Sequence, residues 1–192
     1  MIKTENFKKV EVTSGKALRT WLEKNYKQQE SIWLVTFKKN VPEKYLSTAD
    51  VLDELLCFGW IDGIRRKLDD TRTMQLISPR KAEHWAKSYK DRVAKLIKEG
   101  RMHKAGLQAI EAAKKSGLWN FMDDVDKLIV PKDLQEALKK NKEAEVFFYA
   151  INDSSKRFVL RWLKLAKTDK TRLARINQLV TLSAKKEKLK GS

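Results

Sequence analysis

The hydrophobic pattern of this chain changes its period near residue 79, and this change limits the folds that the chain can adopt. Before that point, two stretches have the aromatic and β-branched content of strands, residues 31–38 and 61–77. After Ser78 and Pro79, apolar residues recur every three or four positions, as they do in amphipathic helices. Strands gathered early and helices gathered late favour an α+β fold over an alternating parallel sheet.

The first part of the chain is predicted to form a small β-sheet with flanking helices. Ser14 and Ser47 are suitable N-caps for two helices, and Gly59 is placed to end the second. The stretch 31–38 is apolar on both faces and is therefore expected to be a central strand. The expected order is helix 14–26, strand 31–38, helix 47–58, strand 61–68 and strand 73–77, the last two joined as a β-hairpin.

The rest of the chain is predicted to be helical. One apolar stripe begins at Trp85 and stops at Gly100, and a second begins at Leu107 and stops at Gly117. Pro131 marks a boundary, and the charged tail 185–192 is expected to fray. Four further helices are expected near 132–140, 143–151, 154–166 and 169–182. We therefore expect an α+β domain over 1–125 and a helical domain with a basic tail over 126–192.

The charge balance favours anionic partners. The 192 residues include 42 Lys and Arg against 25 Asp and Glu, a formal net charge of +17. Such a charge suits nucleic acid, acidic lipid headgroups or acidic proteins, and it also simply aids solubility. The first residues have no apolar segment typical of a secretory signal, and no run is long enough to span a membrane. These features predict a cytoplasmic protein.

The residues that usually carry catalysis are sparse. The two histidines, His84 and His103, are isolated in basic surroundings, and the single cysteine, Cys57, lies in an apolar run. Nucleophilic catalysis needs an activating base, and a structural zinc site needs closely spaced ligands, so no catalytic residue, metal or cofactor is predicted. Cys57 is expected to be a buried, inert thiol. Asp53 and Glu54 are expected on an exposed helix face.

One group of residues is a candidate site for a small anionic ligand. Asp62 lies between an apolar run and Gly63, and an acid in that position is costly to bury unless it is paired. Arg80 lies where a strand passes into a helix. The candidate ligand-binding residues are Trp60, Asp62, Arg65, Arg80 and Trp85. In the alternative interpretation, Asp62 binds backbone amides of the Gly63 turn or pairs with Arg80, and the tryptophans are ordinary core residues.

The C-terminal helices carry the strongest charge asymmetry. From residue 151 onward, Lys and Arg far outnumber Asp and Glu. Basic side chains at helical spacing, opposite an apolar stripe, are able to follow a phosphate backbone. The candidate nucleic-acid-binding residues are Arg157, Arg161, Lys164, Arg172 and Arg175. In the alternative interpretation they form only a solvated helix face.

Several of these motifs together resemble the YdeI/OmpD-associated family. The resemblance rests on the segments 55–63, 78–80, 131–134, 155–157 and 161–172 and on residues between 85 and 107, namely Trp85, Arg92-Val93, Leu96-Ile97, Gly100-Arg101-Met102 and Ala105-Gly106-Leu107. It extends over about residues 30–185. It implies a role in bacteriocin protection or envelope stress, with no specified reaction and no catalytic residues. We therefore expect a non-catalytic binding protein with an unknown anionic ligand or protein partner. The alternatives are a non-specific nucleic-acid-binding protein and an enzyme acting on a small anionic substrate.

Overall fold

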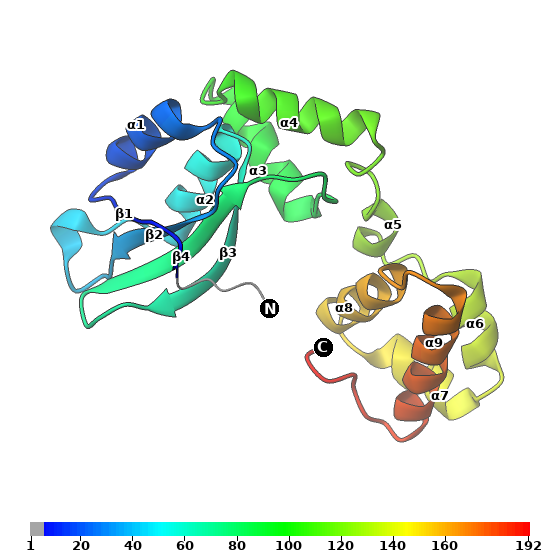
Figure 1. Ribbon diagram of the computed structural model, residues 1–192. Helices are drawn as coiled ribbons and strands as arrows, with labels where there is room; N and C mark the ends of the chain where they lie inside the picture. The colour runs from blue at the N-terminus through cyan, green and yellow to red at the C-terminus, as the bar shows by residue number, and fades with distance from the viewer. Residues whose placement is uncertain (1–5) are drawn as a thin grey trace. The chain divides into compact units, whose positions relative to one another are not determined.

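The computed structural model describes residues 6–192, which separate into two compact units (Figure 1). One unit ends at Asn120 and the other spans Phe121–Ser192. The first contains a sheet with helices and the second is helical, which confirms the expected α+β class. Met122 and Val125 pack into the core of the helical unit, so this unit begins slightly before the boundary expected at residue 125.

The first unit is built on a four-stranded sheet with the strand order β1-β2-β4-β3. Its central strand β2 is buried over five of its six residues, as its two apolar faces predicted. The hairpin of β3 and β4 is also confirmed, with a bulge between Asp62 and Arg65. The elements are β1 (Lys9–Glu11), α1 (Gly15–Asn25), β2 (Ile32–Phe37), a 3-10 helix (Pro42–Lys44), α2 (Thr48–Cys57), β3 (Trp60–Lys67), β4 (Arg72–Pro79), α3 (Lys87–Lys98) and α4 (Lys104–Lys115).

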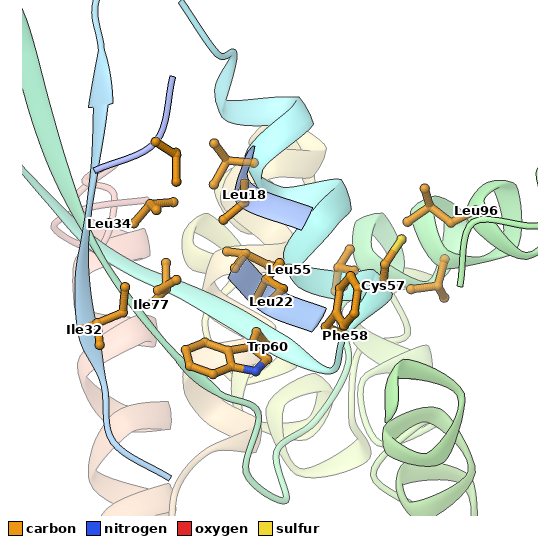
Figure 2. Packing of buried hydrophobic residues seen from close by; sticks show 14 of the residues in the cluster. Leu18, Leu22, Ile32, Leu34, Leu55, Cys57, Phe58, Trp60, Ile77 and Leu96 are labelled. Atoms are coloured by element: carbon orange, nitrogen blue, oxygen red, sulfur yellow. The ribbon is translucent and has the colours of Figure 1, made fainter. Parts of the chain in front are cut away.

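The main core lies between one face of this sheet and the helices α1 and α2. Leu18 and Leu22 of α1 and Leu55 of α2 face Leu34 and Ile77 of the sheet (Figure 2). All five side chains are buried, so their burial supplies the main apolar stabilisation of this unit. This packing fixes the position of β3 and β4, whose ends carry the candidate ligand-binding residues.

Two elements of this unit differ from the sequence predictions. Strand β1 has only three residues and pairs in parallel with β2, and so short a segment has no hydrophobic periodicity to reveal it. Helix α3 begins at Lys87, so the predicted helical start at Trp85 is wrong. Trp85 is nevertheless buried. Its backbone N–H donates to the Leu118 carbonyl, and its ring packs against that of Trp119 with 5.1 Å between the ring centroids.

Two glycines hold the junction between α2, β3 and α4. Gly59 has a φ of +72°, which ends α2 as predicted and turns the chain into β3. Gly106 on α4 lies against the end of α2, where a Cβ atom would come within 2.3 Å of the Cys57 carbonyl oxygen. Only glycine therefore allows α4 to approach α2 this closely.

The second unit is a set of helices around its own core. Leu134, Leu138, Phe148 and Leu163 are fully buried there. The elements are α5 (Asp123–Asp126), α6 (Lys132–Lys139), α7 (Lys142–Ala150), α8 (Asp153–Lys164) and α9 (Asp169–Ala184). The short α5 was not predicted. The expectation of a frayed tail is wrong at Leu189, which is buried against this core.

Candidate functional site

Arg80 is the centre of the candidate ligand site in the first unit. It follows β4, and its backbone N–H donates to the Gly59 carbonyl at 2.8 Å, which extends the pairing with β3. Its guanidinium lies 3.9 Å from the centre of the Trp85 ring and 5.5 Å from that of Tyr89. These distances place a cation against two aromatic faces.

The hydrogen bonds of Arg80 are incomplete within the described residues. Nη2 donates to the His84 carbonyl at 3.0 Å, whereas Nε and Nη1 are buried and have no hydrogen-bond partner there. Burial lowers the pKa of Arg80, and the electrostatic effects of Glu83, the Tyr89 hydroxyl and Asp62 act in the opposite direction. An arginine remains charged in proteins, so Arg80 is a half-buried cation, two of whose buried nitrogens lack an acceptor among the described residues.

Asp62 is held by two neutral side chains. Its Oδ2 accepts a hydrogen bond from Gln75 Nε2 and its Oδ1 accepts one from the Tyr89 hydroxyl, both at 3.1 Å. Arg65 joins the same network by donating to Gln75 Oε1 at 2.6 Å. The predicted partners of Asp62, the Gly63 turn amides or Arg80, are therefore wrong, because Tyr89 lies between the two charges with its hydroxyl on Asp62 and its ring under Arg80.

Four of the five predicted residues thus meet through Gln75 and Tyr89. We name the set Asp62, Arg65, Gln75, Arg80, Trp85 and Tyr89 the Arg80 cluster. Trp60, the fifth, is fully buried in the main core (Figure 2). Its ring contacts that of Trp21 edge to face, with 5.6 Å between the ring centroids. The structure therefore places Trp60 among the core residues and not in the Arg80 cluster.

The two residues that sequence analysis missed had different signals. Gln75 is the one long polar residue on the inward face of β4, two positions before the buried Ile77, and such a residue indicates a buried hydrogen-bond network. Tyr89 was assigned only to an apolar helical stripe. Nothing in the sequence showed that its hydroxyl reaches Asp62.

Two cavities open at Arg80. The smaller has a volume of about 160 Å³ and is walled by Trp85, Leu118 and small residues of α4. The larger has a volume of about 400 Å³ and is lined by Ile61, Leu76 and Pro79 together with polar groups. Arg80 lines both of them, so both cavities are candidate places for an anion beside this residue.

Asp53 and Glu54 are buried, so the prediction that they are exposed is wrong. Asp53 accepts from Arg92 at 2.6 Å, and Glu54 accepts from Arg19 at 3.0 Å and from Arg101 at 2.8 Å. The three arginines come from α1, α3 and the segment before α4. Their ion pairs offset the desolvation cost of burying the two carboxylates. We name these five residues the acid–arginine network. The network connects α2 to α1, to α3 and to the segment before α4, and it leaves neither carboxylate unpaired.

Cys57 is buried, as predicted, at the end of α2. Burial raises the pKa of its thiol to about 11, with the Glu54 charge acting in the same direction. The thiol is therefore protonated near neutral pH, which disfavours a nucleophilic role.

The basic residues of the second unit are largely engaged with partners. Arg172 binds Asp133 through two nitrogens at 2.5 and 2.9 Å, and Lys164 binds Asp124 at 2.5 Å. Their partners, with backbone amides, lower the pKa of both carboxyl groups, although burial opposes this. Arg175 donates to the Trp162 carbonyl and stacks over its ring at 4.9 Å.

The two remaining basic candidates lie on α8. Arg157 is 3.9 Å from Asp153, both of them exposed, and Arg161 also has an interaction partner. The five residues are therefore present on α8 and α9, but three of them are tied into the fold. Among residues 6–192, no helix is long and apolar enough to cross a membrane.

Together these features define a protein with an α+β unit, which carries a buried arginine site, followed by a helical unit. Residues 10–109 match the family described as "Domain of unknown function (DUF8412)". This match covers more than half of the chain, so the chain belongs to that family.

The helical unit matches a second family. Residues 127–186 match the one described as "Bacteriocin-protection, YdeI or OmpD-Associated". The resemblance expected from the sequence is thus confirmed over the C-terminal part of its predicted range, whereas the N-terminal part matches the first family. No curated protein and no solved structure matches the chain.

Proposed function

We propose that this protein is a non-catalytic binding protein whose first unit binds an anionic group at Arg80, and that it acts in bacteriocin protection. The observation that carries the binding role is the buried guanidinium with two nitrogens lacking an acceptor among the described residues. A buried donor without an acceptor costs about 1–3 kcal/mol, and more when it is charged. An anion at Arg80 removes this cost, so the site favours anions over neutral molecules.

The protective role is supported by the helical unit, whose residues 127–186 match the bacteriocin-protection family. The net charge of +17 argues against direct capture of cationic peptides, because like charges repel. Binding of an anionic ligand is compatible with this charge. The cytoplasmic location expected from the sequence stays a prediction.

Thermal unfolding in the presence of small anions tests the binding role. We expect acetate, benzoate or inorganic phosphate to raise the melting temperature of the wild-type protein relative to chloride at equal ionic strength. In Arg80→Met this increase should disappear, while the variant without ligand should melt at the same temperature as the wild type or higher. A buried unpaired charge is replaced there by an apolar side chain of similar length.

The matched control is Lys98→Met, which removes one positive charge at an exposed position of α3. Both variants lose one positive charge, so non-specific screening by salt affects them equally. Lys98→Met should keep the full increase in melting temperature with anions, because it leaves Arg80 in place. If Arg80→Met responds to anions as Lys98→Met does, the binding role is wrong. Strong destabilisation of unliganded Arg80→Met would instead make Arg80 a structural residue.

A further inference from the structure

We propose that the smaller cavity at Arg80 binds a compact apolar monocarboxylate, with the carboxylate on Arg80 and the apolar body among the alanines of α4. This inference rests on the proposed binding of an anion at Arg80 and specifies which class of anion is bound. Its basis is the joint placement of a buried cation and an apolar wall around one small space.

The size of the cavity limits the ligand. Its volume is about 160 Å³. An apolar protein cavity of about 150 Å³ is known to take up benzene, so a body of about one six-membered ring fits here. A nucleotide or a sugar phosphate is too large for this space.

The walls of the cavity limit the ligand further. They include the rings and methyl groups of Trp85, Leu118, Ala109, Ala112 and Ala113. Ser116, another wall residue, already donates its hydroxyl to the Ala113 carbonyl at 3.2 Å. A body with hydroxyl groups would therefore find few partners, whereas an apolar ring or branched chain is favoured.

The charges around the cavity favour a single carboxylate. Nε and Nη1 of Arg80 are buried and lack an acceptor among the described residues, and a carboxylate oxygen is able to accept a charged hydrogen bond from either of them. Lys81 and Glu83 also line the cavity and carry opposite charges, so with Arg80 the lining keeps one positive charge in excess, which matches a monoanion. Trp85 covers the guanidinium at 3.9 Å and also walls the cavity, so the charged and apolar parts of the ligand would share this residue.

Isothermal titration calorimetry on the full chain tests this inference with three probes. Benzoate has the proposed charge and size, benzyl alcohol has the same ring without the charge, and inorganic phosphate has charge without the ring. We expect benzoate to bind at least about tenfold more tightly than either of the others. Arg80→Met should reduce benzoate binding to the level of benzyl alcohol.

A second variant tests the cavity itself. Ala112 lies at an exposed edge of the cavity wall, so Ala112→Leu should fill the space without straining the core. We expect it to weaken benzoate binding at least about tenfold while leaving the melting temperature of the free protein nearly unchanged. Gln108→Leu, an exposed position of α4 outside the cavity wall, is the control and should bind benzoate as the wild type does.

The outcomes separate this inference from the proposed function. If phosphate binds through Arg80 and benzoate does not, the anion site stands and the monocarboxylate assignment is wrong. If Ala112→Leu binds benzoate as tightly as Gln108→Leu, the ligand lies outside the smaller cavity and the inference also fails. If no anion binds, both proposals fail.

Discussion

The hydroxyl of Tyr89 on α3 donates to the Asp62 carboxylate on β3 at 3.1 Å, and the ring of the same tyrosine lies 5.5 Å from the Arg80 guanidinium. One side chain thus contacts both the acid and the cation of the cluster. Sheet and helix are joined at this point, so the geometry of the Arg80 cluster depends on a contact with a neutral residue.

Replacing Asp62 should therefore destabilise the protein. Asp62→Ala leaves the Tyr89 hydroxyl and the Gln75 amide without their acceptor, and we expect a loss of about 1–3 kcal/mol in the free energy of unfolding. Urea denaturation followed by circular dichroism measures it. Tyr89→Phe removes only one of the two bonds and should cost less, so equal losses would contradict the assigned network.

Replacing Gly106 should destabilise the junction of α2 and α4. The added Cβ of Gly106→Ala would lie 2.3 Å from the Cys57 carbonyl oxygen and 2.7 Å from that of Leu56. Alanine is the better helix former by about 1 kcal/mol, but backbone atoms cannot rotate away, and overpacking costs about 1–3 kcal/mol. We expect a lower urea midpoint for Gly106→Ala. Gln108→Ala, exposed on the same helix, should not lower it.

Breaking the acid–arginine network should have a larger effect. In Glu54→Leu, Arg19 and Arg101 lose the carboxylate that they share. The side chain of Glu54 is 10% exposed, but those of its partners are 34% and 36% exposed, so we expect a cost near the lower end for buried pairs, about 3 kcal/mol. The control is Glu23→Leu, which removes an exposed acid near Arg19. Thermal unfolding compares the melting temperatures of the two variants, and that of Glu54→Leu should be lower. Equal melting temperatures would contradict a structural role for Glu54.

His103 should make stability depend on pH. Its Nδ1 accepts the Ala105 N–H at 3.3 Å at the start of α4, and its ring stacks on Phe58 at 4.7 Å. Burial, with the charges of Lys104 and Arg19, lowers the pKa of His103 below its usual 6.5, and Glu23 opposes this. As the pH falls, His103 is therefore protonated in the unfolded chain before it is protonated in the folded protein. The contribution of neutral His103 to the free energy of unfolding is complete above pH 6.5 and is lost as the pH falls toward the folded pKa.

The variant His103→Asn tests this dependence, because asparagine is also a good N-cap and does not titrate. Between about pH 7.5 and about pH 5.5, the wild type should lose more unfolding free energy than the variant. Parallel curves for the two proteins would show that His103 does not cause the change.

The basic residues of α8 and α9 should contribute little to nucleic-acid binding. Lys164, Arg172 and Arg175 already bind groups of the fold. Of the five candidate nucleic-acid-binding residues, Arg157 and Arg161 are therefore the pair to test. We expect the double variant Arg157→Glu and Arg161→Glu to bind duplex DNA about as weakly as the wild type in fluorescence anisotropy. A uniform loss of affinity and a salt slope flatter by roughly 0.9 per lost phosphate contact would instead support the nucleic-acid alternative.

The sequence predicted the elements that have a long, regular pattern. The apolar run 32–37 marked the central strand, and Gly59 marked the end of α2. Strand β1 was missed because three residues carry no period, and Trp85 was assigned to a helix because an apolar residue just before a helix fits the same spacing.

The site was only partly predictable for a different reason. Trp60, Asp62, Arg80 and Trp85 lie near the junction of β3, β4 and α3, which the expected hairpin already suggested. Their partners were not predictable, because each depends on the register of the hairpin and on the rotation of α3. The same applies to Asp53 and Glu54, whose burial requires arginines from three distant segments.

The burial of Cys57 gives the chain a natural reporter of its own opening. A protonated thiol at the junction of α2 and α4 reacts with an alkylating reagent only when that junction separates. Because Cys57 is the single cysteine, the rate of mass gain measures this one event without any engineered label. The same measurement, with and without an anion at Arg80, reports whether occupying the site slows the local unfolding of the first unit.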